Sequence, residues 1–332
     1  MGRRVRGLST LIFSAIGAVS ALGVAPAHAS EGGASLYLLG SGGPGAAVMP
    51  PLEGVYLDNT IYIYDGSAGG GKQFVIGGNV VAGLDATIVA DFATALWVPT
   101  TDLAGGTLAL GVALPLGAPI VDVNAVITGP RGGQIAVSRH DSTLTLGDPI
   151  ATAMLGWKTG NVHIQASTMV NIPVGHYRED QLANIAFHRW AGDASLAVSW
   201  HDPKAGWDVS GKLGVTFNGK NDYTDYNTGN EFHLEAAAEK TFSPTFSAGI
   251  QGYYFKQISG DSGAGARLGA FKGEVIGLGV TAATNVVLGK APATFRIRVL
   301  KEFEATNRLE GASVFASLTL PLSMKMPAGA PP

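Results

Sequence analysis

The feature that most constrains this chain is an alternation of apolar and polar residues that recurs in segments of strand length. Residues 207–217 read WDVSGKLGVTF, in which every second residue from Trp207 to Phe217 is apolar or glycine. A period of two is typical of a β-strand whose two faces meet different surroundings. The same alternation is found in residues 162–172, 195–201, 231–239, 295–304 and 310–322. We therefore expect an all-β protein.

Weaker strand patterns fill much of the remaining sequence. They lie at about 55–64, 73–82, 84–98, 105–115, 119–128, 148–158, 246–257 and 270–281. Glycines interrupt the alternation within residues 65–145, so the number of strands there stays open. Together the segments predict about 12 spanning strands, or as many as 14.

Composition indicates what the apolar faces meet. Charged residues make up only 14% of the chain, against about 25% in typical soluble domains, and glycine is abundant at 47 residues. Beyond residue 29 no run of 18 apolar residues predicts a membrane helix. A soluble β-sandwich would also alternate, but it explains the low charge and the many long strands less well. We therefore expect a transmembrane antiparallel β-barrel, because closed barrels let strands cross lipid with every backbone group paired.

The first residues have the pattern of a secretory signal peptide. Three arginines precede the apolar stretch 11–24, and the small-residue pattern Ala27-His28-Ala29 follows shortly after it. A membrane anchor is the alternative, but the stretch is shorter than the roughly 20 residues that a spanning helix needs. We expect a signal peptide over 1–29, a flexible lead or plug segment over 30–54, the barrel over 55–322 and a periplasmic tail over 323–332, in the bacterial outer membrane.

Charge and cysteine content exclude several functions. Cleavage after Ala29 removes three arginines and no acidic residue, which lowers the formal net charge from −3 to −6. Such a chain is a poor candidate for nucleic-acid binding, which needs basic patches. The chain has no cysteine, so disulfides and thiol catalysis are excluded.

The connections between strands alternate in length. Those at 159–160, 202–206, 241–245 and 285–291 are short, whereas those at 173–193, 218–229 and 258–268 are longer and polar. Outer-membrane barrels have short periplasmic turns and longer extracellular loops. The alternation therefore predicts which end of the barrel faces the periplasm.

The sequence gives little support for catalysis, a metal site or a cofactor. Residues 40–45 read GSGGPG and match G-x-G-x-x-G, but no strand-turn-helix unit surrounds them. The histidines form no H-x-x-x-H or H-E-x-x-H pattern. Ser199, His201 and Asp202 could be assigned to a hydrolase, but no third partner is placed to orient the base. We expect neither an enzyme nor a bound cofactor.

Charged residues on the polar faces are candidates for lining the pore. They are Lys212, His233, Glu235, Glu239, Arg296, Arg298, Glu302 and Glu304. One interpretation is that they pair with each other and brace the barrel wall. The other is that some of them set the polarity of a permeation path.

Several stretches resemble a family of bacterial outer-membrane proteins of the phenol-degradation meta pathway. They are PPLEGVYLDN (50–59), IPVGHY (172–177), GWDVSGKLGVTFNGKNDYTDYNTGNEFHLE (206–235), GYYFKQISGDSG (252–263) and EFEATNRLEG (302–311). The resemblance implies an outer-membrane transporter and, less directly, uptake of aromatic or other hydrophobic small molecules. It also singles out loop residues, which either meet the solute or form ordinary turns. These are Asn218, Asn221, Tyr223, Asp225, Tyr226, Gln257 and Asp261.

We therefore expect an outer-membrane channel for passive uptake of small molecules. The alternatives are a structural or adhesive barrel whose outer loops bind a partner and, with less support, an outer-membrane hydrolase. The expected partners are outer-membrane lipid, the solute and the barrel-assembly machinery. The sequence identifies neither the solute nor the oligomeric state.

Overall fold

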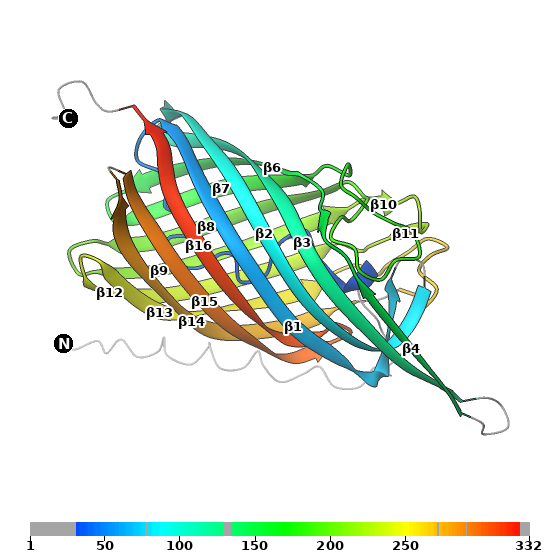
Figure 1. Ribbon diagram of the computed structural model, residues 1–332. Coiled ribbons are helices and arrows are strands. Elements are labelled where there is room, and N and C mark those ends of the chain that lie inside the picture. Colours follow the sequence, from blue (N-terminus) through cyan, green and yellow to red (C-terminus); the bar gives the residue numbers. More distant parts are fainter. Residues whose placement is uncertain (1–30, 77–78, 129–133, 271, 290, 326–332) are drawn as a thin grey trace, which may run out of the picture.

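A computed structural model describes residues 31–76, 79–128, 134–270, 272–289 and 291–325. It shows a closed antiparallel barrel of 12 strands (Figure 1). The wall strands are β1 (Gly54–Ile76), β2 (Asn79–Leu103), β3 (Gly106–Thr128), β6 (Ile150–Thr159), β7 (Val162–Asn171), β8 (Ala191–Asp202), β9 (Trp207–Asn218), β12 (Glu231–Ser243), β13 (Phe246–Gln257), β14 (Glu274–Leu288), β15 (Ala291–Thr306) and β16 (Glu310–Met324). The other elements are η1 (Glu31–Gly33), β4 (Gln134–Ser142), β5 (Thr145–Leu146), β10 (Lys220–Asn221) and β11 (Tyr226–Asn227).

Pairing of the first and last wall strands closes the barrel. β1 pairs with β16 from Gly54↔Met324 to Ser67↔Glu310, so neither strand leaves a free edge along that seam. The expected all-β transmembrane barrel is confirmed, with the lower of the two strand counts. The segments predicted at 105–115 and 119–128 form the single strand β3, and the segment predicted at 73–82 spans the β1–β2 hairpin. Prolines and glycines in these strands interrupt the sequence pattern without ending the strand.

The barrel has its apolar side outward. In β9 the side chains of Trp207, Val209, Leu213 and Phe217 are between 44% and 54% exposed, whereas Asp208, Ser210 and Thr216 are buried. Leu213 lies opposite Leu196 of β8 and Leu234 of β12, and all three are exposed. This arrangement is the reverse of a soluble sheet, and it places the apolar band against lipid. The protein is thus a bacterial outer-membrane barrel.

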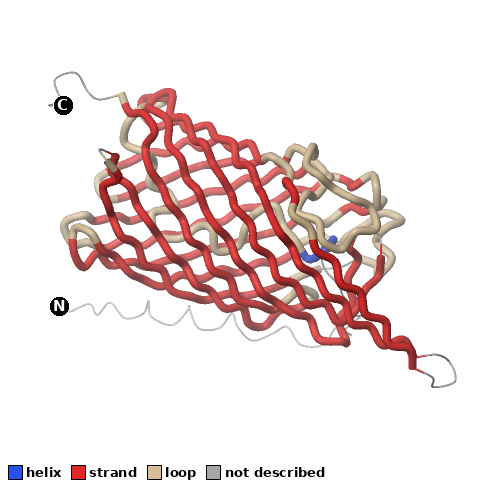
Figure 2. The backbone as a smooth tube through the Cα atoms, viewed as in Figure 1, coloured by secondary structure: helices blue, strands red, loops and turns tan. Residues whose placement is uncertain are grey.

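The two ends of the barrel differ in the length of their connections. Turns of two to four residues join β6 to β7, β8 to β9 and β12 to β13 at the end where Gly54 and Met324 lie. The long connections at residues 172–190, 219–230 and 258–273 gather at the opposite end, where Figure 2 shows most of the loops. We call these the turn end and the loop end. By the usual arrangement of such barrels, the turn end faces the periplasm.

The wall is longest and least regular where the chain begins. The β3–β4 hairpin projects beyond the loop end, with β4 paired to β3 from Ile120↔Ser142 onward (Figure 1), whereas the tip of the β1–β2 hairpin packs Phe74 and Ile76 against Leu182 and Ala183. β3 pairs with β6 only as far as Ala113↔Ile150. Beyond that point the two strands separate, and β5 pairs with β3 at Leu116 and Gly117.

Within the described part of the chain, no helix is long and apolar enough to cross a membrane. The predicted signal peptide, residues 1–29, lies outside the described residues, as does most of the predicted tail.

We expect Leu213→Arg to destabilise the barrel, because it places a charge midway along β9 on the lipid face. A charge near the bilayer midplane costs about 2–4 kcal/mol, whereas one near the interface costs about 0–1 kcal/mol. Leu288→Arg, at the turn end of β14 and on the same face as the exposed Leu278 and Val280, is the matched control. Urea unfolding in lipid vesicles measures both. Equal losses for the two variants would contradict the lipid-facing assignment.

Candidate functional site

The N-terminal segment, residues 31–53, runs through the barrel lumen from the loop end to the turn end. Near the loop end, Asn221 Nδ2 donates to Glu31 Oε2 over 3.1 Å. Near the turn end, the Gly45 amide donates to Asp208 Oδ1 over 2.9 Å and the Ala47 amide to Ser199 Oγ over 3.0 Å. Figure 1 shows this segment in dark blue between the wall strands. Backbone amides of the segment thus pair with polar side chains of the inner wall.

The middle of the segment is held by three of the residues predicted to line the pore. The Tyr37 ring stacks on His233 with centroids 3.5 Å apart and an interplanar angle of 9°. Lys212 Nζ lies 4.9 Å from the centre of the same ring. The Gly40 amide donates to Glu235 Oε1 over 2.7 Å. Lys212, His233 and Glu235 therefore bind the segment rather than face an open lumen.

Glycine lets the segment approach the wall closely at this level. Gly40 has a φ of 86°, and a Cβ added at Gly42 would overlap Glu235 Oε2. The G-x-G-x-x-G match at 40–45 therefore supplies backbone flexibility and close contact inside a barrel. Two short turns, Ser41 N to Leu38 O and Ala46 N to Gly43 O, shape this stretch.

Apolar packing reinforces the polar contacts. Tyr37 and Leu39 are buried in a cluster with Phe255, Leu300 and Phe315 of the wall. Charged groups and rings of the segment and the wall thus pack against one another in the central lumen.

The contacts of His233 do not form a catalytic relay. Asp193 Oδ2 lies 3.0 Å from His233 Nε2, and Ser195 Oγ lies 3.5 Å from the same nitrogen. His233 Nδ1 is buried without a hydrogen-bond partner. A relay needs the carboxylate and the nucleophile on opposite ring nitrogens. Asp193 and Ser195 therefore position the His233 ring against Tyr37.

The other charged candidates mostly brace the wall. Arg296 makes two hydrogen bonds to the Glu239 carboxylate, one of them over 3.1 Å. Glu302 is buried and accepts hydrogen bonds from Tyr64 OH over 2.7 Å and from Tyr253 OH over 2.9 Å.

Arg298 and Glu304 make different contacts. The Arg298 guanidinium lies 5.9 Å from the centre of the Phe315 ring, and its Nε is buried without a partner. Glu304 is exposed and has a φ of 58°, at a bulge where the β14–β15 register shifts. The bulge interrupts the alternation that places Arg296, Arg298 and Glu302 on one face.

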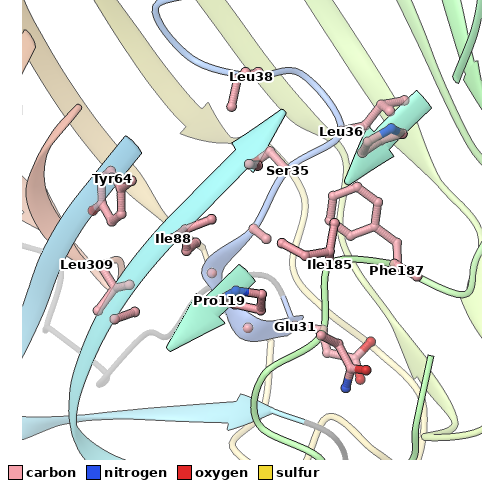
Figure 3. A pocket seen from close by; sticks show the side chains of 18 of the residues that line it. Glu31, Ser35, Leu36, Leu38, Tyr64, Ile88, Pro119, Ile185, Phe187 and Leu309 are labelled. Atoms are coloured by element: carbon pink, nitrogen blue, oxygen red, sulfur yellow. The ribbon is translucent and has the colours of Figure 1, made fainter. Parts of the chain in front are cut away.

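A cavity of about 240 Å³ lies between the N-terminal segment and the wall, toward the loop end. Figure 3 shows Leu36 and Leu38 of the segment around a space that Ile88 of β2, Pro119 of β3 and Phe187 of the 172–190 loop also line. Most of its lining is apolar. An apolar cavity of roughly 150 Å³ accommodates benzene, so this one has room for a substituted aromatic ring.

The 172–190 loop covers the cavity where β3 and β6 separate. Asp148 holds the loop by accepting hydrogen bonds from the Gly175 amide over 2.8 Å and the Phe187 amide over 2.8 Å. The Ile185 side chain lies so close to β3 that a Cβ added at Gly117 would come within 2.5 Å of it. Prolines 115 and 119 in this part of β3 have no amide hydrogen to donate.

Two buried arginines, Arg189 and Arg308, also line the cavity. Arg189 Nε donates to Asn218 Oδ1 over 3.2 Å, while Nη1 lies 3.9 Å from Glu31 Oε2. Arg308 Nη1 donates to Ser35 Oγ over 3.2 Å, and its guanidinium lies 4.1 Å from the centre of the Phe255 ring. Sequence reasoning missed both arginines, because they lie in loops without periodicity.

The loop residues singled out by the family resemblance form two groups. Asn218 and Asn221 contact Arg189 and Glu31, so they support the polar end of the cavity. Tyr226 and Gln257 are buried and donate to the Asp261 carboxylate, which ties two loops together.

The two remaining loop candidates are more exposed. Asp225 pairs with Lys220 over 2.5 Å. The Tyr223 ring is 53% exposed and stacks on His188 at 4.0 Å. Within the described ranges, no group of three histidine, aspartate or glutamate side chains is placed to hold a metal ion.

Comparisons with known proteins agree with this architecture. A closed antiparallel barrel with an apolar outer face is the fold of an outer-membrane protein. The model of the family described as a MetA pathway of phenol degradation matches residues 70–318, and the chain belongs to that family. No curated protein matches the chain.

Among solved structures, the chain is similar to the COG4313 outer membrane channel from Pseudomonas putida F1. Identity is 18%, the TM-score is 0.64, and the match covers 83% of this chain and 98% of that one. A Pseudomonas aeruginosa FadL homologue matches at 12% identity and a TM-score of 0.40, covering 89% of this chain and 97% of that one. The first of these likenesses shows a shared fold.

We expect Glu235→Ala to loosen the middle of the N-terminal segment. The variant removes the carboxylate that accepts from the Gly40 amide, and a hydrogen bond to a charged group contributes about 1.5–3 kcal/mol. Hydrogen exchange in peptides covering 36–46 should accelerate about tenfold or more. Glu235→Gln keeps an acceptor and should have a smaller effect, and Glu310→Ala, an exposed site, should have none. Unchanged exchange in Glu235→Ala would refute this anchoring role.

Asp261 should make the outer loops pH-dependent. Burial raises the pKa of its carboxyl to about 6, against the opposing effect of hydrogen bonds from Tyr226, Gly229 and Gln257. Because the folded-state pKa is raised, the protonated form is favoured in the folded loops. The stabilisation is complete below a pH of about 4 and is lost as the pH rises through 6.

We therefore expect residues 258–270 to resist proteolysis better at pH 4.5 than at pH 7.5. An acid-active protease with a broad pH range provides the measurement. Asp261→Asn should show much less pH dependence, and Asp222→Asn, at an exposed loop site, should behave like the wild type. Greater resistance at the higher pH would reverse the sign and contradict the assignment.

Proposed function

We propose that the protein is an outer-membrane channel for passive uptake of small hydrophobic molecules, aromatic compounds among them. The observation that carries this proposal is the apolar cavity enclosed by the N-terminal segment, strands β1–β3 and the 172–190 loop. Its size suits one substituted aromatic ring, and its mostly apolar lining offers few hydrogen-bond partners to a sugar. Family membership and the likeness to a solved outer-membrane channel support the same conclusion.

The contrast between the cavity and the central lumen favours hydrophobic solutes over hydrophilic ones. At the level of Tyr37 and Glu235 the lumen is occupied by the segment and by charged wall residues that already have partners. A hydrophilic solute would have to displace these contacts. A hydrophobic solute gains about 25 cal/mol for each Å² of apolar surface that it buries, and the cavity supplies such surface.

We expect Ile88→Trp to reduce uptake about tenfold, because Ile88 lines the cavity and a larger ring would fill it. Val89→Trp is the matched control, since the neighbouring side chain lies on the outer face and is 42% exposed. The measurement is the initial uptake of a radiolabelled alkylbenzene by cells carrying each variant in the outer membrane. Cells without the protein set the baseline.

Two outcomes would contradict the proposal. Uptake by the wild type at the baseline rate would favour the structural or adhesive alternative. Equal uptake by Ile88→Trp and Val89→Trp would show that the solute does not enter this cavity.

A further inference from the structure

We propose that the cavity binds amphipathic monocarboxylates, with the carboxylate on the Arg189 guanidinium and the apolar body among Leu36, Ile88 and Phe187. This inference rests on the proposed function and narrows its substrate class to acids that carry a ring or a short alkyl chain. It follows from a guanidinium donor left without a hydrogen-bond partner at one end of an otherwise apolar cavity.

Arg189 is a buried cation with unused hydrogen-bonding capacity. Its side chain is 2% exposed, and its Nη2 is buried without a hydrogen-bond partner. Its Nη1 lies 3.9 Å from Glu31 Oε2, beyond hydrogen-bond distance. Leaving a buried donor unpaired is costly, and the cost is greater for charged groups. A carboxylate entering the cavity would supply the missing acceptor, and the guanidinium suits two parallel hydrogen bonds to it.

The acidic groups of the cavity are already committed. Asp148 accepts from Asn171 Nδ2 and from loop amides, and Glu302 accepts from two tyrosines and from the Gly311 amide. Glu31 accepts from Asn221 Nδ2 over 3.1 Å and from Tyr177 OH over 3.4 Å. The acidic side chains thus have donors of their own, whereas Arg189 keeps a free one.

Arg308 adds a second positive charge to the same cavity. It is 9% exposed, and among the described residues no carboxylate oxygen lies within 4.0 Å of its guanidinium nitrogens. Its hydrogen bond goes to the neutral Ser35 hydroxyl. The three carboxylates of the lining, Glu31, Asp148 and Glu302, balance these two charges, so preference for an anionic headgroup depends on the unpaired guanidinium donor of Arg189 and not on net charge.

Calorimetric titration of the full chain in zwitterionic lipid nanodiscs tests the inference. The probes are 4-ethylbenzoate, neutral 4-ethylbenzamide and cationic 4-ethylbenzylamine, which share one apolar body. We expect the wild type to bind the acid at least tenfold more tightly than the amide. Arg189→Met should lose that tenfold for the acid and leave the amide unchanged. Arg178→Met is the control, because Arg178 lies exposed in the same loop and outside the cavity lining.

Glu31→Gln gives an independent test with the opposite sign. It removes the negative charge nearest Arg189, so the acid should bind several-fold more tightly to this variant. The test remains decisive if Arg189→Met fails to fold, because unchanged or weaker acid binding in a folded Glu31→Gln barrel would overturn the inference.

The outcomes separate this inference from the proposed function. Equal affinities for acid and amide would overturn the carboxylate site and leave the apolar cavity as a binding site. Equal losses in Arg189→Met and Arg178→Met would also overturn it. Failure of all three probes to bind would remove both the carboxylate site and the cavity's role in uptake.

Discussion

Backbone hydrogen bonding inside lipid is the constraint on which the rest of this structure depends. No water is present there to satisfy an unpaired amide or carbonyl, so the strands must form a closed ring. Because side chains alternate along each strand, turning the apolar faces outward forces the polar faces inward. Asp208, Ser210 and Thr216 are therefore buried on the inner side of β9, where a soluble protein would place its core. The inward side chains need hydrogen-bond partners. The width of the barrel decides whether other wall residues or a separate segment provides them.

A ring of this width cannot be filled by its own side chains. About eight strands give an interior that wall residues alone can fill, and a larger ring leaves space. Residues 31–53 occupy that space and supply amide donors to Glu235, Asp208 and Ser199. The segment does not complement the wall everywhere. Toward the loop end it presents Leu36 and Leu38 instead of polar groups, and there the apolar cavity forms beneath Ile185 and Phe187. One stretch of the N-terminal segment therefore fills the lumen with polar contacts, and another stretch borders the apolar cavity.

Periodicity made the wall predictable and left the lumen unpredicted. The alternation within one strand identifies its lipid-facing and lumen-facing residues, so the faces of residues 162–172 and 207–217 could be assigned without knowing which strands lie beside them. The strand count was harder, because Pro115, Gly117 and Pro119 interrupt the pattern inside the continuous strand β3. The contacts that build the cavity join residues far apart in sequence, such as Ser35 with Arg308 and Glu31 with Asn221. No local pattern marks such pairs. Glu304 was predicted to line the pore because the alternation continues to it in the sequence. A bulge in β15 ends the alternation before that residue.

The direction in which the N-terminal segment is threaded has a consequence for biogenesis. Glu31 lies among the loops, whereas Gly54 lies at the opposite rim, where β1 meets β16. Glu31 is thus directed toward the cell exterior, while β1 starts on the periplasmic side. Once β1 has paired with β16, the N-terminal segment is surrounded by a closed ring of hydrogen-bonded strands. The segment therefore enters the lumen either before β1 and β16 pair or afterwards through the turn end, where β1 begins.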